Sequence, residues 1–153
     1  MLAIDLIPRT AWGSNLRARF PEHWDAIRKA TYRAAGWACE CCGATGQQEC
    51  HEVWDYSDKP VQRLVRLISL CNLCHSAQHY GLAQVRGIGD QVDEHIRRVN
   101  GWSQRQLDLH VAEAFGIWRA RNRVEWTTDT SILDAFIAEK KHLPLQLIQR
   151  RNP

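Results

Sequence analysis

The 153-residue chain lacks any long apolar segment. No stretch approaches the roughly 18 consecutive apolar residues that a membrane-spanning helix needs, so we expect no membrane partner. The first residues, MLAIDLIPRT, have neither the basic start nor the long apolar run of a secretory signal peptide. We therefore expect a cytoplasmic protein in a reducing compartment, where closely spaced cysteines favour metal binding over disulfides.

The chain also lacks a strong charge, internal repeats and low-complexity segments. Its net charge is +3 and its sequence pI is about 8.6. This permits nucleic-acid binding without arguing for it, because nucleic-acid-binding domains are usually strongly basic. Basic residues are dense in three places, and each cluster taken alone is typical of a solvated helix face. The clusters are Arg97 and Arg98; Arg119, Arg121 and Arg123; and Lys140, Lys141, Arg150 and Arg151.

Apolar periodicity and turn residues predict an α+β fold. Residues 1–36 are expected to form a loop over about the first 20 positions and then a helix, opened by Pro21. Two strands are expected at 47–56 and 61–70, although short apolar runs distinguish strand from helix poorly. A cysteine-rich turn and a further helix ending near Gly81 follow the second strand.

The C-terminal half has a helical pattern. We predict helices over 90–99, from Ser103 onward and over 131–141, packed on the rest of the fold. Ser103 and Gln106 have the spacing of a capping box, in which each residue caps the other's backbone N–H. Beyond these helices we expect part of the basic tail 142–153 to be disordered.

Cysteine spacing gives the most specific signal in the sequence. Two C-x-x-C pairs stand with 28 residues between them. The pairs are Cys39 with Cys42 and Cys71 with Cys74. Each pair can supply two thiolates to one ion, and zinc prefers four tetrahedral ligands. We predict one structural zinc, because four thiolates leave no open position for substrate. Gly43 permits a tight turn behind the first pair, and Cys41 and Cys50 are interpreted as ordinary thiols.

Three of the seven histidines lie within or directly after the segment that the cysteine pairs frame. His51 falls on the first predicted strand, while His75 and His79 are four apart and share one helix face. A strand histidine or carboxylate and a helix histidine could hold Mg2+ or another divalent ion at an open site. Such an ion neutralises charge on a scissile phosphate, and a nearby base activates water. The alternative is a hydrogen-bonded structural role, which we assign to the other four histidines.

These residues resemble the HNH nucleases that carry zinc-binding cysteine pairs around a ββα-metal core. The resemblance rests on Cys39-x-x-Cys42-Gly43, on Glu49 to Val53, and on Leu70-Cys71-x-x-Cys74-His75-x-x-x-His79. A wider pattern over roughly residues 8 to 127, including Trp12-Gly-Ser-Asn15 and Val99-Asn-Gly-Trp102, is also similar to small proteins labelled HNH endonucleases. The expected organisation is a loop and helix at 1–36, a zinc-stabilised ββα core at 37–84, a helical region at 85–141 and a tail at 142–153.

The chain departs from the HNH pattern at two positions. The first strand of the family usually ends in Asp-His or His-His, a metal ligand followed by the general base. Alignment on the flanking residues puts His51 and Glu52 there, whereas a slip of one residue would make His51 the base. Arg66 stands where the family has its middle Asn, and we consider it a possible phosphate contact. His75 matches the final His.

The resemblance implies a metal-dependent endonuclease that hydrolyses phosphodiester bonds in nucleic acid, with DNA favoured over RNA. His51 and His75 would hold the divalent ion, with His79 in support and Glu52 as base or third ligand. A carboxylate can be a general base at neutral pH when burial raises its pKa. The alternative is a zinc module on the same scaffold that binds nucleic acid or a protein partner without cleavage. A salt bridge between Glu52 and Arg66 would favour this alternative.

Overall fold

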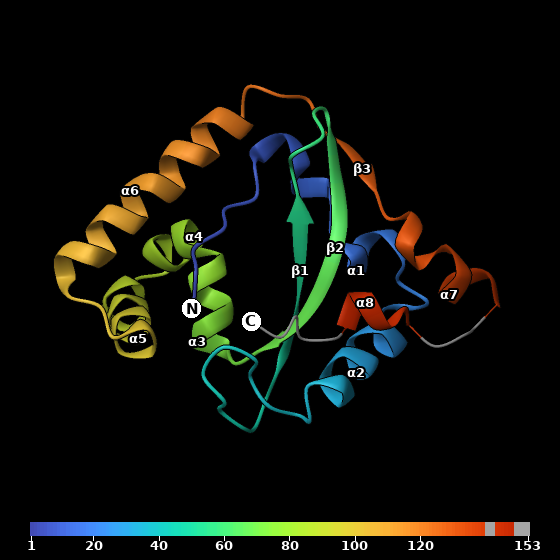
Figure 1. Ribbon diagram of the computed structural model, residues 1–153, viewed down its shortest axis with the longest axis horizontal. Coiled ribbons are helices and arrows are strands. Elements are labelled where there is room, and N and C mark those ends of the chain that lie inside the picture. The colour runs from blue at the N-terminus through green and yellow to red at the C-terminus, as the bar shows by residue number, and fades with distance from the viewer. Residues whose placement is uncertain (140–142, 149–153) are drawn as a thin grey trace.

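A three-stranded sheet runs through the computed structural model, which describes residues 1–139 and 143–148 (Figure 1). Strand β1 (Glu49–Asp55) pairs antiparallel with β2 (Val61–Leu70), and β2 also pairs in parallel with the short β3 (Thr127–Asp129). β2 is therefore central, and its many leucine and β-branched side chains suit a strand that is buried on both faces.

Helices and two short 3-10 turns cover both sides of this sheet. In chain order they are η1 (Arg9–Ser14), α1 (Leu16–Arg19), α2 (Trp24–Ala34), α3 (Asn72–Gln78), α4 (Tyr80–Val85), α5 (Gly89–Asn100), α6 (Gln104–Arg121), η2 (Ser131–Leu133), α7 (Asp134–Glu139) and α8 (Leu145–Ile148). Figure 1 shows α3 to α6 on one side of the β1–β2 pair and α1, α2, α7 and α8 on the other. Within this described part of the chain, no helix has the length and apolar character needed to cross a membrane.

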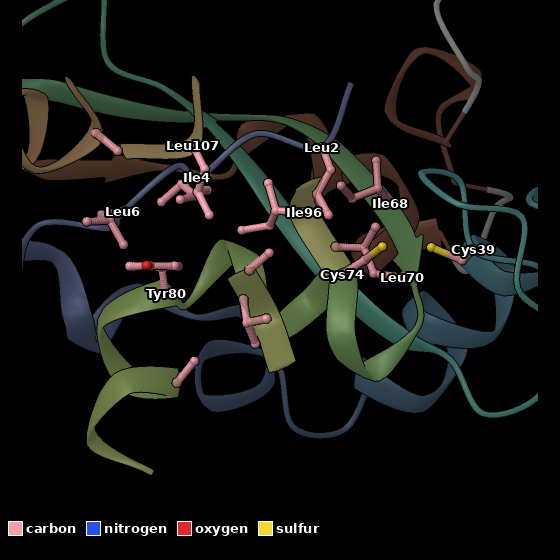
Figure 2. Close-up of a cluster of buried hydrophobic side chains, with 14 residues drawn as sticks. Leu2, Ile4, Leu6, Cys39, Ile68, Leu70, Cys74, Tyr80, Ile96 and Leu107 are labelled. Carbon is pink, nitrogen blue, oxygen red and sulfur yellow. The ribbon is translucent and has the colours of Figure 1, made fainter. Parts of the chain in front are cut away.

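The buried apolar side chains of the described residues form two clusters, one on each side of the sheet. Leu67 and Ile68 of β2 contribute to different clusters, because successive strand side chains project to opposite faces. Figure 2 shows the first cluster, where the N-terminal segment meets β2, α4, α5 and α6. Its labelled apolar members include Leu2, Ile4, Leu6, Ile68, Leu70, Tyr80, Ile96 and Leu107. The second cluster includes Leu16, Ile27, Trp54, Leu64, Leu133 and Leu147.

The N-terminal segment lies in the first core rather than on the surface. The backbone N–H of Leu2 donates to Asn100 Oδ1 at 2.7 Å, and Asn100 Nδ2 donates back to the carbonyl of Leu2 at 2.8 Å. The N–H of Ile4 donates to Nε2 of His110 at 2.9 Å. These bonds satisfy backbone groups that burial would otherwise leave unpaired. A loop is predicted from the sequence over the first 20 residues, but η1 and α1 occupy part of this stretch.

The predicted α+β class is confirmed, and most element positions differ only at their ends. β2 has the predicted bounds, β1 is shorter than 47–56, and α2 begins at Trp24 rather than at Pro21. The helix expected after the second cysteine pair is divided at His79, whose φ of −101° and ψ of 41° leave the helical region. This break separates α3 from α4 and places His79 between them.

The C-terminal helices carry the expected capping box. Ser103 Oγ accepts from the Gln106 N–H at 3.3 Å, and the Ser103 N–H donates to Gln106 Oε1 at 2.9 Å. The predicted tail also contains α8, and Leu147 of this helix is fully buried in the second core. The basic residues Lys140, Lys141, Arg150 and Arg151 lie outside the described residues.

We expect Ser103→Ala to lower the free energy of unfolding by about 1 kcal/mol, because it leaves an N-terminal N–H of α6 without its acceptor. Urea denaturation followed by circular dichroism measures this change. Ser103→Thr is the matched control, because it keeps the hydroxyl and should lose less. Equal stability of the alanine variant and the wild type would contradict a stabilising role for the cap.

Candidate metal centres

Four cysteine side chains converge between the loop after α2 and the start of α3. This four-cysteine cluster consists of Cys39, Cys42, Cys71 and Cys74, and its sulfur atoms all lie within 4.8 Å of one another. The Sγ atoms of Cys42 and Cys71 are 3.6 Å apart. Zn–S bonds of about 2.3 Å in a tetrahedron place sulfurs about 3.8 Å apart, so the donor set and its spacing fit zinc. Figure 2 shows the sulfurs of Cys39 and Cys74 pointing toward one another at the edge of the first core.

The local backbone geometry orients the thiols of both cysteine pairs. In the first turn, the Gly43 N–H donates to the Cys39 carbonyl at 2.8 Å, and the Cys39 N–H donates to the Ala44 carbonyl at 2.8 Å. Gly43 has a φ of +77°, a left-handed conformation that glycine adopts without a Cβ penalty. In the second pair, the His75 N–H donates to the Cys71 carbonyl at 2.9 Å, so the first turn of α3 orients both thiols.

The two other cysteines differ in their surroundings. Cys41 packs against the first core, and its interaction with Cys39 raises the pKa of the Cys41 thiol to about 11. Cys50 lies in the second core and donates to Thr31 Oγ1 at 3.6 Å, and burial raises its pKa to about 12. Neither belongs to the four-cysteine cluster, as the spacing of the C-x-x-C pairs predicts.

A histidine on α5 contacts the four-cysteine cluster. The Nε2 atom of His95 lies 3.1 Å from the Sγ of Cys74, and Nη2 of Arg98 lies 3.0 Å from His95 Nδ1. Because an arginine can only donate, His95 Nδ1 accepts and Nε2–H donates to sulfur. Donation to a thiolate reduces its charge and orients it. The sequence predicts a structural role for His95 but does not reveal its partner, which lies 21 residues away.

Three imidazoles converge beside the four-cysteine cluster. This histidine cluster consists of His51 from β1, His75 from α3 and His79 from the α3–α4 junction. One ring nitrogen from each lies within 4.8 Å of the others. The ring centroids of His75 and His79 are 4.6 Å apart, and that of His51 is 5.5 Å and 5.3 Å from them. His51 is only 3% exposed while the other two are half-buried, so the cluster opens toward the helices.

Glu49 supports the histidine cluster and has no role in the sequence-based prediction. Its Oε2 lies 3.0 Å from His75 Nδ1. A carboxylate there holds the proton on Nδ1 and leaves the Nε2 lone pair of His75 for a cation. Glu49 and His51 are two apart on one strand, so they share a face. This spacing of two residues is the one signal in the sequence that places Glu49 near His51.

The electrostatics of the histidine cluster suit a cation. Burial, with the neighbouring rings as a smaller cause, holds the pKa of His51 well below its ordinary value. Burial also lowers the pKa of His79 to about 4, and it lowers that of His75 against the opposing effect of Glu49. Neutral imidazoles keep a lone pair for metal. His51 Nδ1 is buried and has no hydrogen-bond partner among the described residues, a deficit that a bound ion could relieve.

Glu52 and Arg66 do not meet each other. The Leu16 N–H donates to Glu52 Oε1 at 3.0 Å, while Arg66 forms an ion pair with Glu40. Glu52 follows His51 directly in β1 but does not belong to the histidine cluster. Burial raises the pKa of the Glu52 carboxyl, and the bond from Leu16 opposes this. The structure therefore shows neither a Glu52–Arg66 salt bridge nor convergence of Glu52 on His75.

No protein-family model, no curated protein and no solved structure matches the chain. The likeness to HNH nucleases therefore rests on the cysteine and histidine motifs, and it enters below as part of a proposal.

We expect purified protein to carry about one zinc ion in the four-cysteine cluster, as a closed tetrahedral site requires. Cys71→Ser should lower zinc content and thermal stability together, because binding energy in such a site is folding energy. Cys50→Ser is the matched control and should retain zinc, since Cys50 lies in the other core. Elemental analysis with thermal unfolding measures both effects. A stable, zinc-free wild type would contradict the assignment.

We also expect Glu49→Gln to weaken divalent-ion binding at the histidine cluster about 10-fold or more, the usual effect of losing a carboxylate that supports a ligating histidine. Asn72→Ala is the control, because Asn72 Nδ2 donates to Glu49 Oε1 at 3.3 Å without touching His75. Titration of zinc-loaded protein with Co2+, followed by visible absorption, measures the affinity. Equal affinity of Glu49→Gln and wild type would remove Glu49 from the site.

Proposed function

We propose that this protein is a metal-dependent endonuclease of HNH type that hydrolyses phosphodiester bonds in DNA. The observation that carries the proposal is the convergence of the histidine cluster on one point beside a four-cysteine cluster. The histidines come from β1, which pairs antiparallel with β2, and from α3 and its junction with α4. This is the order of elements in a ββα-metal core, and the four-cysteine cluster fixes the helix that carries His75.

The proposed ligands are the three neutral imidazoles. Imidazole nitrogens suit Zn2+, Fe2+, Co2+ or Ni2+, whereas Mg2+ prefers oxygen ligands. We therefore favour a transition-metal ion over Mg2+ at this site. Three protein ligands also leave a position open for water or substrate, unlike the closed four-thiolate set.

Each side chain has a defined part in the proposed reaction. A divalent ion held here would neutralise charge on the scissile phosphate and lower the pKa of a water molecule. His51 and His79 would each offer a lone pair to the ion, and Glu49, by holding the Nδ1 proton of His75, would leave the Nε2 lone pair of His75 to bind it. Glu52, at the base position of the family, bonds to Leu16 instead. We assign it no direct contact with the ion.

The proposed phosphate contacts come from exposed cations on the helical half. Arg119 and Arg123 are exposed. Arg121, between them, forms an ion pair with Asp5 and stacks 3.9 Å from the centroid of the Tyr56 ring, so it is committed to the fold. Contacts from exposed arginines to phosphates release counterions, and DNA affinity should therefore fall as salt concentration rises.

A second candidate function is a zinc-stabilised module that binds nucleic acid or a protein without cleaving. The observation that favours it is the placement of Glu52 and Arg66, which stand at the base and asparagine positions of the family. Glu52 accepts a hydrogen bond from Leu16 and Arg66 pairs with Glu40, so each is bonded to another part of the fold. The two candidates differ in one measurable property, which is turnover in the presence of a divalent ion.

We expect wild type to nick supercoiled plasmid with Co2+, Ni2+, Zn2+ or Mn2+ and to do so poorly with Mg2+. His75→Ala should lower the rate about 100-fold or more while keeping the zinc of the four-cysteine cluster, because it removes an ion ligand alone. Glu52→Gln should lose less than about 10-fold, since Glu52 lies outside the histidine cluster.

Two results would change the proposal. A loss in Glu52→Gln as large as that in His75→Ala would identify Glu52 as the general base. Absence of cleavage of DNA by zinc-loaded wild type with every ion tested would leave the binding module as the function. Zinc content and circular dichroism of each variant separate these effects from loss of folding.

A further inference from the structure

A cavity of about 680 Å³ lies beside the histidine cluster and has no role so far. Its walls come from η1, β1, the α3–α4 junction, α4 and α6. His79 belongs both to the histidine cluster and to the cavity wall, so the two sites share this side chain. The volume falls within the range of about 300–1,000 Å³ that small-molecule pockets usually have.

Three tryptophans, Trp12, Trp54 and Trp118, line the cavity, and two of their indole rings are held in place. The Nε1–H groups of Trp12 and Trp118 donate to the same carbonyl, that of Ile7, at 3.2 Å and 3.1 Å. Their polar edges are thus satisfied, and the exposed ring of Trp12 remains available for contact. Phe115 packs edge-on against Trp118 with ring centroids 6.0 Å apart. Trp12 is 64% exposed, which is unusual for a large aromatic ring that the fold holds in a fixed position.

A cation and hydrogen-bonding groups accompany these rings. The guanidinium of Arg9 lies 5.0 Å from the centroid of the Trp118 ring, and Arg9 has no acidic partner within the described residues. Glu52 and Asn15 also line the cavity. Exposed aromatic faces, an unneutralised arginine and a few polar groups are the combination that binds single-stranded nucleic acid through base stacking and phosphate contact.

We propose that this cavity takes an unpaired nucleobase of the substrate, stacked on Trp12, while Arg9 contacts the adjoining phosphate. The proposal rests on the proposed function and deepens it, because it places the base next to the phosphate held at the histidine cluster. A base in an intact duplex is stacked and paired and cannot enter such a cavity without being extruded. The protein therefore prefers single-stranded DNA, or duplex with an unpaired base, over intact duplex.

Equilibrium binding without added divalent ion tests this proposal apart from cleavage. Fluorescence anisotropy compares three labelled probes of equal length: an oligothymidylate, an abasic backbone of the same charge and an intact duplex. Wild type should bind the oligothymidylate about 5-fold or more tightly than the abasic backbone, the lower end of what stacking of one base contributes. It should also prefer the oligothymidylate to the duplex.

Variants at Trp12 identify the cavity as the source of the preference. Trp12→Ala should bind the oligothymidylate and the abasic backbone equally, and Trp12→Phe should keep part of the difference, because it retains a ring face. Trp37→Ala is the matched control: Trp37 is 53% exposed, lies beyond α2 and does not line the cavity. Circular dichroism and zinc content establish that each variant is folded.

The outcomes separate this proposal from the proposed function. Equal affinity of wild type for the oligothymidylate and the abasic backbone, or an unchanged preference in Trp12→Ala, overturns the base-binding cavity even if plasmid nicking is observed. A preference that depends on Trp12 without any nicking supports the cavity and overturns the nuclease. Absence of binding to all three probes overturns the base-binding cavity, and plasmid nicking decides the proposed function separately.

Discussion

The convergence of four thiols is the constraint on which the rest of the structure depends. The Sγ atoms of the four-cysteine cluster crowd within 4.8 Å, and without a cation they compete for protons. Donation from the neighbouring Cys41 and Cys74 thiols lowers the pKa of Cys39, while the pKa of Cys74 is raised. A divalent ion would remove this conflict by binding all four as thiolates. The start of α3 is then fixed relative to β2, which ends one residue before Cys71. This fixes the positions of His75 and His79, which lie on α3 and directly after it.

Glu40, which lies between Cys39 and Cys42, links the first cysteine turn to the sheet. The Glu40 N–H donates to the Ser69 carbonyl at 2.9 Å, and the Ser69 N–H donates to Glu40 Oε1 at 3.0 Å. The other carboxylate oxygen of Glu40 pairs with Arg66. Arg66 therefore anchors the cysteine turn to β2. At the position where HNH nucleases carry an asparagine, this chain has an ion pair that supports the turn of the four-cysteine cluster, and the phosphate contact considered for Arg66 stays a prediction.

Features set by short-range geometry could be predicted from the sequence, whereas features set by tertiary packing could not. The C-x-x-C spacing, the capping box at Ser103 and the strand over 61–70 each depend on neighbouring residues and are found where expected. The anchoring of Leu2 by Asn100 spans 98 positions, and the bond from His95 to Cys74 spans 21. The tautomer of His75 depends on Glu49, 26 positions away, and the aromatic cavity depends on an N-terminal segment that local patterns describe only as a loop.

The ligands of the two clusters differ in charge: thiolates are negative, whereas the imidazoles are neutral. This difference suits a structural role for the first cluster and a substrate-binding role for the second. Four thiolates more than neutralise a zinc ion, so the excess negative charge requires donors, and His95 supplies one to Cys74 with Arg98 behind it. Such a site holds the fold together but has no positive charge to offer a substrate. The imidazoles of the histidine cluster are neutral, so an ion there keeps its full charge. That charge can act only on a group that reaches it from the open, helical side, because His51 closes the sheet side. The cavity containing Trp12 borders the histidine cluster through His79, so a base held there, as proposed, would bring its own phosphate toward an ion at the cluster.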